Sequence, residues 1–546
     1  MIELPHIFRE AVRITRHLGF QYLWIDSLCI IQDSSLDWET EASMMSTVYS
    51  DAICNIAFLF PPGEESPRHR DDPRTITPCI VRRATSEVCG SYIVPIRYSL
   101  VDDEPVYDDW FLATTWPWST RAWTFQEHIL SPRTIFYGHQ NIMWECTETF
   151  CDELLGIWVP NMIIKLRSYR EKTLRQRFLS GSHRPSSSSS PISAYLEPWQ
   201  DLIHDYRSRE LTNPSDRNIA FAGVAEAFQR EHRLTYLAGS WAESLPFDIL
   251  WYTRHNRFWI DIKMNARTSY TEAPIQESVA AIVPSWSWFS QPIFWPGIDV
   301  SYGVSAVPSK EYLVCMAKLR HFHWPGRILN QIPPTSFHDF AGLSITLELA
   351  TYKICCGHSR SPITVDQPNS HRADFHAQLV CFLGKASEVC DHGVRSSRKP
   401  AVSIDFLLDS LEVTEYLPET VHFAVIVEKV ASFLADTSSG HSIIVEESCR
   451  LHGLELAPGE QEGTWKRIGY WEAHLSRPSY ELNDEELASL EPYCAKDRKV
   501  DRNKVRPDLD PPSTQAKQEW LRAWSKKKGS RVLQMEGVKM ETLTLV

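Results

Sequence analysis

The sequence lacks the patterns that mark several large classes of protein. No apolar run approaches the roughly 20 residues of a membrane helix, and the N-terminus has no basic-then-apolar signal peptide. The 13 cysteines are an odd number and form no CxxC pair, which favours reduced thiols over a disulfide framework. The net charge of −13, spread over 546 residues, argues against a nucleic-acid partner. We therefore expect a cytoplasmic protein without a membrane span.

Motifs for common cofactors are also missing. The chain has no GxGxxG, P-loop or GxSxG sequence. Cys146 and Cys151 lie near His128 and His139 in the sequence, but their spacing matches no recognisable zinc site. The sequence accordingly predicts neither a metal ion nor a bound cofactor.

The composition and the N-terminal pattern together favour a well-packed α/β protein. The hydrophobic content is 43%, which is ample for several cores. Helical spacing of apolar residues over 7–18 and a capping-box-like start at Ser34 predict two helices. The runs at 22–30 and 53–60 are apolar on both sides, as is typical of strands in a parallel sheet covered by helices. This order predicts an α/β unit over residues 5–150 in which the two strands are neighbours.

One residue of the first predicted strand is unexpected. Asp26 lies in the middle of YLWIDSLCII (22–31), and a buried carboxylate is unfavourable unless it is paired, hydrogen-bonded or functional. If the strand ends near Ser27, Asp26 lies at its carboxyl end, where ligands bind in open α/β sheets. Two interpretations remain: a carboxylate that accepts hydrogen bonds from neighbouring backbone amides, or one that contacts a ribose or another substrate group.

The rest of the chain can be interpreted more coarsely. The remaining elements are, in order, a strand near 92–100, a helix near 120–130, strands near 134–137 and 141–146, a helical segment over 195–260, and strands at 284–290 and 342–356. A Ser-rich stretch at 180–193 has a composition that cannot pack. Between 495 and 531, 12 Lys and Arg stand against 5 Asp and Glu, which indicates a basic, solvated segment.

Three groups of motifs carry a resemblance to a known family. The first is LWIDSLCIIQD (23–33) with MMSTVYSDA (44–52), and the second is STRAWTFQEHILSPRTIFYGHQNIMWEC (119–146). The third comprises LTNPSDRNIAFAG (211–223), YLAGSW (236–241), LW (250–251) and PSWSWFS (284–290). In this order they resemble the HET-domain (heterokaryon incompatibility) proteins of filamentous fungi, across roughly residues 5–150 for the domain and 195–290 for its usual downstream partner.

The resemblance also implies a missing part. The family's domain begins with a strand that reads roughly Leu-Ser-Tyr-x-Trp-Gly, about a helix's length before YLWID, whereas Met1 here directly precedes the predicted helix. We therefore expect an N-terminally incomplete domain, through truncation or a lost exon. The expected parts are the HET domain at 1–155, a helical connector and Ser-rich linker at 156–193, a helical HET-associated region at 194–290, a β-rich domain at 291–480 and a charged, basic tail at 481–546.

The HET domain in turn is distantly similar to the TIR domain, a flavodoxin-like signalling module some of whose members hydrolyse NAD. The order of the parts agrees: a strand with an Asp, a helix, a short strand, and a helix with Trp and Glu. This similarity implies a TIR-like parallel sheet that lacks its first strand. It implies function only by analogy.

The helix near 120–130 provides the candidate site. Trp123 and Glu127 are four residues apart and share a face, and an indole beside a carboxyl group raises the pKa of that group. Glu127 is the candidate catalytic residue, and Asp26, Arg121 and Trp123 are candidate substrate-binding residues that we expect to converge, with NAD as the substrate. The structural alternatives are a core anchor for Trp123 and a salt bridge between Arg121 and Glu127.

Two functions from different classes follow from this resemblance. One is an enzyme, a TIR-like NAD hydrolase that triggers cell death when non-self is sensed. The other is a non-catalytic signalling module that acts by self-association through the HET domain and recruits an unidentified partner. An inactive, truncated paralogue is a third possibility. The resemblance implies a role in allorecognition and programmed cell death, a form of innate immunity, for the first two.

Overall fold

The computed structural model describes the following residues: 4–59, 79–85, 88–94, 117–138, 142–152, 193–207, 209–255, 282–290, 298–302, 311–327, 332–355, 402–408, 420–436, 443–476, 480–494, 520, 523 and 538–546. The Ser-rich stretch up to 192 and most of the basic segment 495–531 lie outside these ranges. The expectations for those two segments therefore stay predictions.

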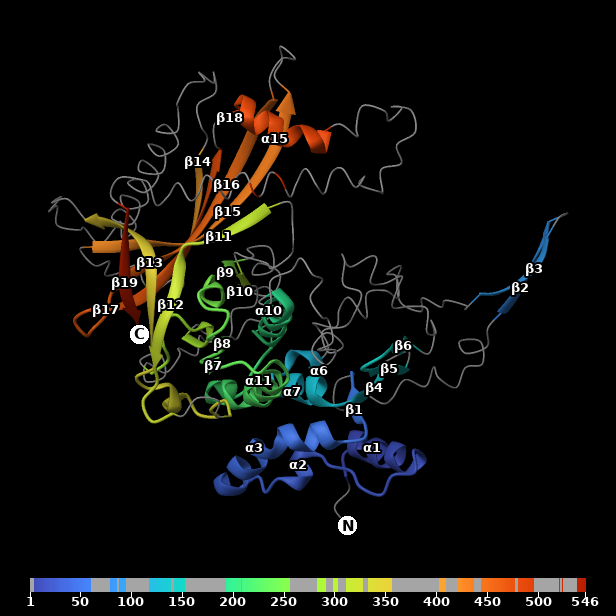
Figure 1. The fold of residues 1–546 in the computed structure, drawn as a ribbon. Coiled ribbons are helices and arrows are strands. Elements are labelled where there is room, and N and C mark those ends of the chain that lie inside the picture. Colours follow the sequence, from blue (N-terminus) through green and yellow to red (C-terminus); the bar gives the residue numbers. More distant parts are fainter. Residues whose placement is uncertain are drawn as a thin grey trace, which may run out of the picture.

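Three helices form a layer along the lower edge of the molecule in Figure 1: α1 (His6–His17), α2 (Asp26–Cys29) and α3 (Ser35–Asp51). The helices predicted at 7–18 and after Ser34 are thereby confirmed. The Ser34 side chain accepts a hydrogen bond from the backbone N–H of Asp37 at 3.2 Å, which satisfies one of the open donors at the start of α3.

The strand predicted at 22–30 is wrong. Tyr22 is 91% exposed and Leu28 51% exposed, whereas Ile30 is 7% exposed, so the run is not buried on both sides as a central strand would be. Asp26 instead begins the single turn α2, and its carboxylate accepts a hydrogen bond from the backbone N–H of Ser27 at 2.7 Å. Short polar side chains that bond the nearby backbone in this way compete with strand pairing. An apolar run of this length does not by itself distinguish a strand from another element.

The first sheet is mixed rather than parallel. It contains β1 (Asn55–Phe58), β4 (Arg133–Tyr137), β5 (Ile142–Cys146) and β6 (Phe150–Asp152) in that order. The strands predicted at 53–60, 134–137 and 141–146 are confirmed. However, β1 pairs in parallel with β4, and the other two pairs are antiparallel. The α/β class is therefore right for this region, whereas an all-parallel sheet is wrong for its described strands.

The connection between β1 and β4 contains the helix of the candidate site. Helices α6 (Pro117–Thr120) and α7 (Trp123–Leu130) precede β4, in agreement with the helix predicted near 120–130. A parallel pair requires such a crossover connection. The hairpin of β2 (Cys79–Thr85) and β3 (Val88–Val94) also belongs to this connection, and the strand predicted near 92–100 overlaps β3.

Among its described residues, the segment predicted as helical, 195–260, contains α-helices only up to His232. Helices α10 (Ser193–Arg207) and α11 (Ile219–His232) agree with the prediction, with the 3-10 turn η3 (Pro214–Arg217) between them. Beyond 232 the chain forms short elements, and PSWSWFS (284–290) is a turn and not the predicted strand. These elements are β7 (Tyr236–Leu237), β8 (Ser240–Trp241), η4 (Phe247–Ile249), β9 (Trp251–His255), η5 (Trp288–Ser290) and β10 (Ile298–Tyr302).

A second sheet, with nine strands among the described residues, dominates the C-terminal half. Its strands are β11 (Glu311–Cys315), β12 (Ala317–His323), β13 (Ser344–Cys355), β14 (Val402–Leu408), β15 (Thr420–Asp436), β16 (Ile443–Pro458), β17 (Thr464–Ser476), β18 (Tyr480–Glu481) and β19 (Val538–Leu545). The 3-10 turn η6 (Phe337–Phe340) precedes β13. The strand predicted at 342–356 is confirmed. The segment expected as a tail at 481–546 contains helix α15 (Asp484–Cys494), and its end, β19, pairs with β13 and β17, so that part of the tail is a sheet strand.

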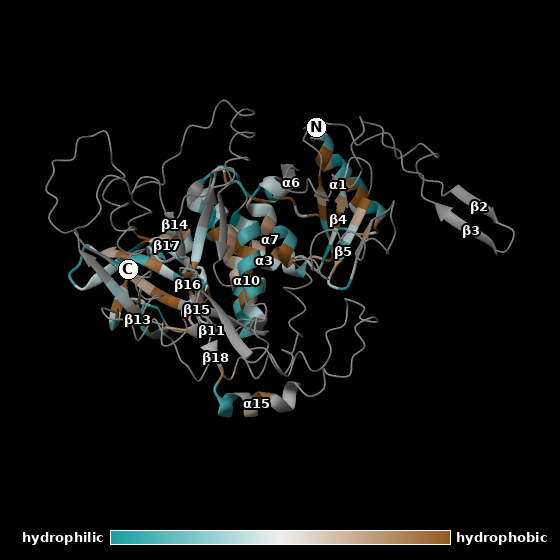
Figure 2. Ribbon diagram, turned by 90° about the horizontal axis from the view of Figure 1, so that it is seen from above, coloured by the Kyte–Doolittle hydropathy of each residue, from teal (hydrophilic) through white to brown (hydrophobic). Residues whose placement is uncertain are grey.

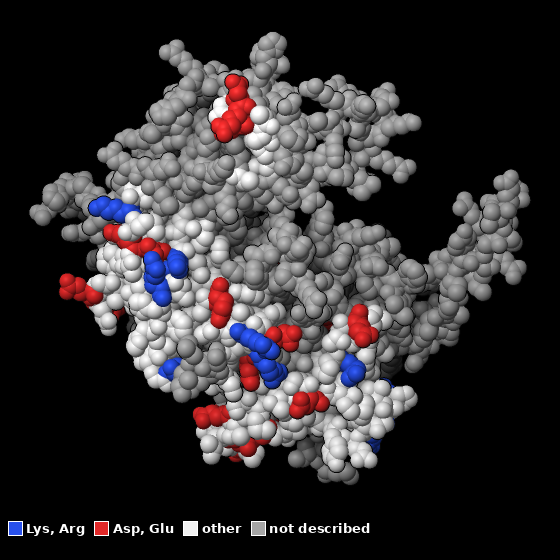
Figure 3. Space-filling model, in the orientation of Figure 1, with Lys and Arg blue, Asp and Glu red and all other residues white. Residues whose placement is uncertain are grey.

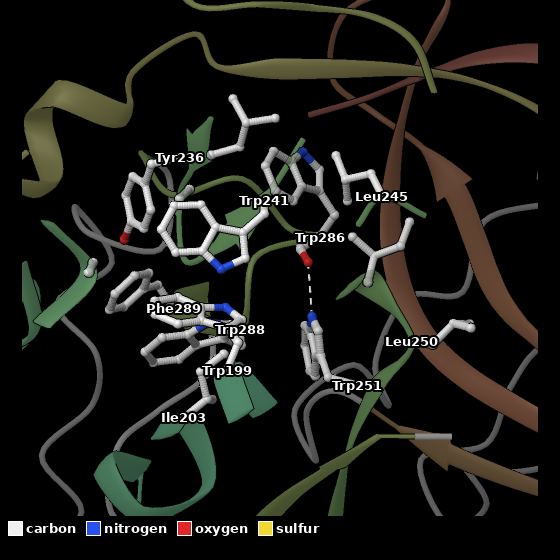
Figure 4. Close-up of a cluster of buried hydrophobic side chains, with 14 of the residues drawn as sticks. Trp199, Ile203, Tyr236, Trp241, Leu245, Leu250, Trp251, Trp286, Trp288 and Phe289 are labelled. Atoms are coloured by element: carbon white, nitrogen blue, oxygen red, sulfur yellow. Dashed lines mark hydrogen bonds between the residues drawn. The ribbon is translucent and has the colours of Figure 1, made fainter. Parts of the chain in front are cut away.

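A tryptophan-rich core joins the helices to this second sheet (Figure 4). The indole N–H groups of Trp199 and Trp288 both donate to the backbone carbonyl of Gly239, at 3.0 and 2.9 Å. Trp251 donates to the carbonyl of Trp286 at 2.9 Å. Both Trp286 and Trp288 are fully buried, as predicted, although not on a strand.

Helix α7 belongs to this same core. Phe125 and Ile129 of α7 are fully buried within it, among residues of α10 and α11. Figure 2 shows apolar residues on α3 and α7 where these two helices lie together. The N-terminal elements are therefore packed against the downstream helices rather than separate from them.

The contact between α11 and α7 predicts a strongly destabilising substitution. A Cβ atom at Gly223 would lie 2.6 Å from Gln126 Oε1 and 2.6 Å from Ser46 Cβ. Alanine is the better helix former by about 1 kcal/mol. We nevertheless expect Gly223→Ala to lower the free energy of unfolding by about 1–3 kcal/mol, because the packed neighbours must move. Glu226→Ala on the same helix should change it by less than about 0.5 kcal/mol. Urea denaturation followed by tryptophan fluorescence measures both, and a stabilised Gly223→Ala variant would contradict the packing argument.

Candidate functional site

Glu127 is anchored between α7 and the first sheet. Its backbone carbonyl accepts hydrogen bonds from the Ser131 hydroxyl at 2.6 Å and from the Asn55 side-chain amide at 3.4 Å. Asn55 is the first residue of β1, so this contact fixes the helix to the edge strand. The backbone that carries the Glu127 side chain is therefore held in place by two hydrogen bonds, and functional sites are most precise on such rigid elements.

Four polar groups surround the Glu127 carboxyl group. The pKa of Glu127 is raised to about 7, first by burial and then by the negative charge of Asp26. Arg121, a hydrogen bond with the Tyr49 side chain, and Arg209 each act in the opposite direction and lower that pKa. The structure thus brings Asp26, Arg121 and Glu127 into one electrostatic cluster, although α2 and α7 are far apart in the sequence.

Tyr49 is a member of this cluster that the sequence did not predict. Its side chain is hydrogen-bonded to Glu127, and burial together with the charge of Glu127 raises the pKa of Tyr49 far above its ordinary value. The phenol therefore stays protonated and donates to the carboxylate. Trp24 packs edge-on against the Tyr49 ring, with 5.7 Å between the ring centroids. The signal was available, because Tyr49 lies on the apolar side of the helix predicted after Ser34 and within MMSTVYSDA.

Arg209 is the second member that was missed. It lies just beyond α10 and is 4% exposed. Its guanidinium donates to the Thr124 hydroxyl at 3.1 Å and to the Asp205 carboxylate at 3.2 and 3.4 Å. It also lies over the Phe125 ring, 5.1 Å from the centroid. The positive charge is thus held in place by contacts to α7 and to α10.

Backbone pairing fixes the neighbouring segment as well. The N–H of Ala122 donates to the carbonyl of Glu210 at 2.8 Å, and the N–H of Glu210 donates to the carbonyl of Thr120. Arg121, which forms the bridge to Glu210, is exposed. The start of α7 is therefore held by residues some 90 positions further along the chain.

Trp123 has partners other than Glu127. Its indole packs edge-on against Trp38 of α3 at 6.3 Å between centroids. Its side chain is also hydrogen-bonded to the carboxyl group of Asp216, whose pKa is raised by burial and lowered in part by this bond. Trp123 is partly buried and packs against the core, which agrees with the structural alternative of a core anchor. The aromatic residue hydrogen-bonded to Glu127 is Tyr49.

An acid–histidine pair lies next to this cluster, because His128 follows Glu127 in α7. His128 Nε2 is 2.6 Å from Glu145 Oε2, and Glu145 is 1% exposed. The His128 ring also packs edge-on against Trp118 at 5.3 Å between centroids. Among the residues that the structure describes, no group of three His, Cys, Asp or Glu side chains is arranged to hold a metal ion.

Comparison with known families identifies the N-terminal region. Residues 1–127 match the family model described as heterokaryon incompatibility protein (HET). The protein carries a HET domain. The HET match ends at Glu127, inside α7, so Arg209 and the rest of the helical core lie beyond it. Comparisons with curated proteins and with solved structures give no significant match. Within the described ranges, no helix is both long and apolar enough to cross a bilayer.

The cluster around Glu127 predicts that substitutions of Asp26 and Arg121 shift the pKa of Glu127 in opposite directions. Asp26→Asn should lower the pKa of Glu127, because the nearby negative charge that favours the protonated form is removed. Arg121→Gln should raise it, because a stabilising positive charge is lost. Carbon-13 NMR titration of glutamate-labelled protein measures the shifts, with Glu127→Gln to assign the signal. Asp33→Asn, in the exposed loop before α3, is the control and should leave the value unchanged. Shifts of equal sign in the two variants would contradict the arrangement.

Proposed function

We propose that the HET domain hydrolyses NAD and that this reaction triggers cell death when non-self is sensed. The observation that carries the proposal is the Glu127 carboxyl group, whose pKa is about 7 and which is surrounded by Tyr49, Asp26, Arg121 and Arg209. Strongly perturbed pKa values of groups in a cluster of charges are typical of functional sites, and a pKa of about 7 leaves a large share of Glu127 ionised near neutral pH. The distant similarity of HET domains to TIR domains supports the same activity by analogy.

The proposed reaction breaks the bond between nicotinamide and its ribose. Positive charge develops on the ribose as the bond breaks, and a water molecule then adds to the anomeric carbon. The products are nicotinamide, ADP-ribose and a proton. An ionised carboxylate beside the ribose stabilises the developing charge or holds the ribose hydroxyl groups. Glu127 is the group assigned to this role.

The other members of the cluster have distinct roles in this proposal. Arg121 is exposed and carries the positive charge that a diphosphate requires. Asp26 lies at the start of α2 and contacts the ribose or another polar group of the substrate. Tyr49 donates its hydroxyl hydrogen to Glu127 and orients the carboxylate. Trp123 is assigned to substrate binding by the sequence alone, and its contacts to Trp38 and Asp216 favour a supporting role. No cofactor takes part, and the site of action is the cytoplasm.

The ionised form of Glu127 gives the proposal a pH dependence. The rate of NAD hydrolysis at low substrate concentration should rise with pH through about 7, because the carboxylate is the active form. In Asp26→Asn this rise should move to lower pH. Activity that falls over the same range would show that Glu127 acts in its protonated form instead.

Substitution of Glu127 tests the catalytic role directly. Glu127→Gln keeps the size of the side chain and removes its charge, so the rate of NAD hydrolysis should fall by roughly 10²–10³-fold. Nicotinamide release by the purified protein and cellular NAD after induced expression measure this. Glu148→Gln replaces an exposed glutamate and is the matched control, with unchanged activity expected. Cell death with unchanged NAD in the wild type would reject the enzyme.

A non-catalytic signalling module that acts by self-association is the second candidate. It is favoured by a different observation, the exposed apolar side chains of the N-terminal helices and of the segments that flank them. In that case Glu127, Tyr49 and Arg209 would stabilise the packing of α7 without reacting. Cell death that persists in Glu127→Gln would favour this candidate, and the surface it would use is considered next.

A further inference from the structure

The exposed apolar side chains of the described residues are concentrated at one end of the chain. Eleven large apolar side chains are exposed, and nine of them lie within residues 4–53. Two members, Tyr22 and Leu36, are 91% and 74% exposed. The nine are Leu4, Leu18, Phe20, Tyr22, Leu28, Ile31, Leu36, Met44 and Ile53. Scattered exposed apolar residues are normal, whereas such a concentration marks an interaction surface. We call residues 4–53 the N-terminal face.

The two long helices of the N-terminal face carry opposite charges. Arg9, Arg13 and Arg16 lie at positions i, i+4 and i+7 of α1, and all three are exposed. Arg13 donates to the Glu10 carboxylate of the same helix at 3.0 and 2.8 Å, so the three arginines outnumber one carboxylate there and the row stays basic. Helix α3 contains no Lys or Arg, and its Glu39 and Asp51 are exposed. The face is therefore basic at one end and acidic at the other, with apolar side chains on and between the helices.

The arrangement of these helices makes the face complementary to itself. Figure 1 shows α1 and α3 at the two ends of one layer, with α2 between them. Figure 3, in the same orientation, shows acidic side chains over the end where α3 lies. A two-fold axis that runs parallel to the layer, just outside its exposed side and midway between the helices, places α1 of one copy on α3 of the other. Both charged contacts then form at once, as an isologous interface requires.

We propose that the N-terminal face is the surface on which a second copy of this chain docks, with the basic row of α1 against the acidic side of α3 in the partner. The apolar side chains between the helices are desolvated in this dimer and provide the main stabilisation. The charges fix the register and exclude the arrangement in which like helices meet. The inference does not depend on NAD hydrolysis. Asp26 and Tyr49 of the cluster around Glu127 lie within residues 4–53, but the arginines of α1, the acidic side chains of α3 and the nine exposed apolar side chains that carry the inference do not belong to that cluster.

Sedimentation velocity over a wide concentration range tests the dimer. The wild-type chain should show a monomer–dimer equilibrium. Reversal of charge on one helix, with R13E/R16E on α1 or E39R/D51R on α3, should raise the dissociation constant by roughly tenfold or more, because like charges then meet. Leu36→Ser with Met44→Ser should weaken the dimer as well, since less apolar surface is buried.

The combination of both reversals is the decisive variant. A chain with R13E/R16E and E39R/D51R again presents opposite charges on the two helices, so it should recover the wild-type dissociation constant. E460R/E462R, which reverses two exposed glutamates of the β16–β17 turn, is the matched control and should leave association unchanged. Circular dichroism confirms folding of each variant. A wild-type monomer at all concentrations, or a combined variant that fails to recover, would overturn the proposal. NAD hydrolysis measured on the same samples tests the enzyme separately.

Discussion

The burial of one short helix, α7, is the constraint on which the rest of the structure depends. Its apolar side chains Phe125 and Ile129 are fully buried in the core that α10 and α11 share with the second sheet. On the same helix, Gln126 is 1% exposed and its side-chain oxygen accepts a hydrogen bond from the N–H of Gly223 at 3.1 Å. Only a glycine allows this approach of α11, because any Cβ atom would overlap with α3 and α7 together. The two halves of the molecule are thus joined through α7.

This packing explains why the pKa of Glu127, which lies next to the buried face of α7, is raised. With Phe125, Gln126 and Ile129 directed into the core, Glu127 lies at the margin, where α2, α3 and the residue after α10 meet. Partial burial disfavours the charged form of its carboxyl group, and the two arginines compensate only in part. A structural salt bridge would hold the pKa below its usual value. A pKa of about 7 instead reflects burial and the charge of Asp26, which together outweigh the two arginines and the hydrogen bond with Tyr49.

The sequence was most informative where local chemistry decides the outcome. The cap at Ser34, the helical spacing over 7–18 and the strands around β1 and β4 were predicted correctly, because neighbouring residues determine them. Prediction from the sequence failed where contacts between distant segments determine the local structure. YLWIDSLCII is as apolar as a buried strand, yet Asp26 and Ser27 form a local turn and Tyr22 faces solvent. Likewise, the tryptophans of PSWSWFS pack in a turn in which Trp288 donates to the carbonyl of Gly239, and no alternation pattern reveals such a contact.

The candidate site shows the same division. Asp26, Arg121 and Glu127 could be proposed from sequence, since a carboxylate in an apolar run and charges at a helix start are visible in one chain. Arg209 could not, because it reaches α7 only through the fold, by way of Thr124 and Phe125. The residues matched to the HET family end at Glu127, but the second of the two positive charges that lower the pKa of Glu127 and the backbone that pairs next to Arg121 come from 209–210. The electrostatics of the HET domain in this protein are therefore a property of the domain together with its downstream helices, and the matched residues alone would lack both the support for α7 and one of its two arginines.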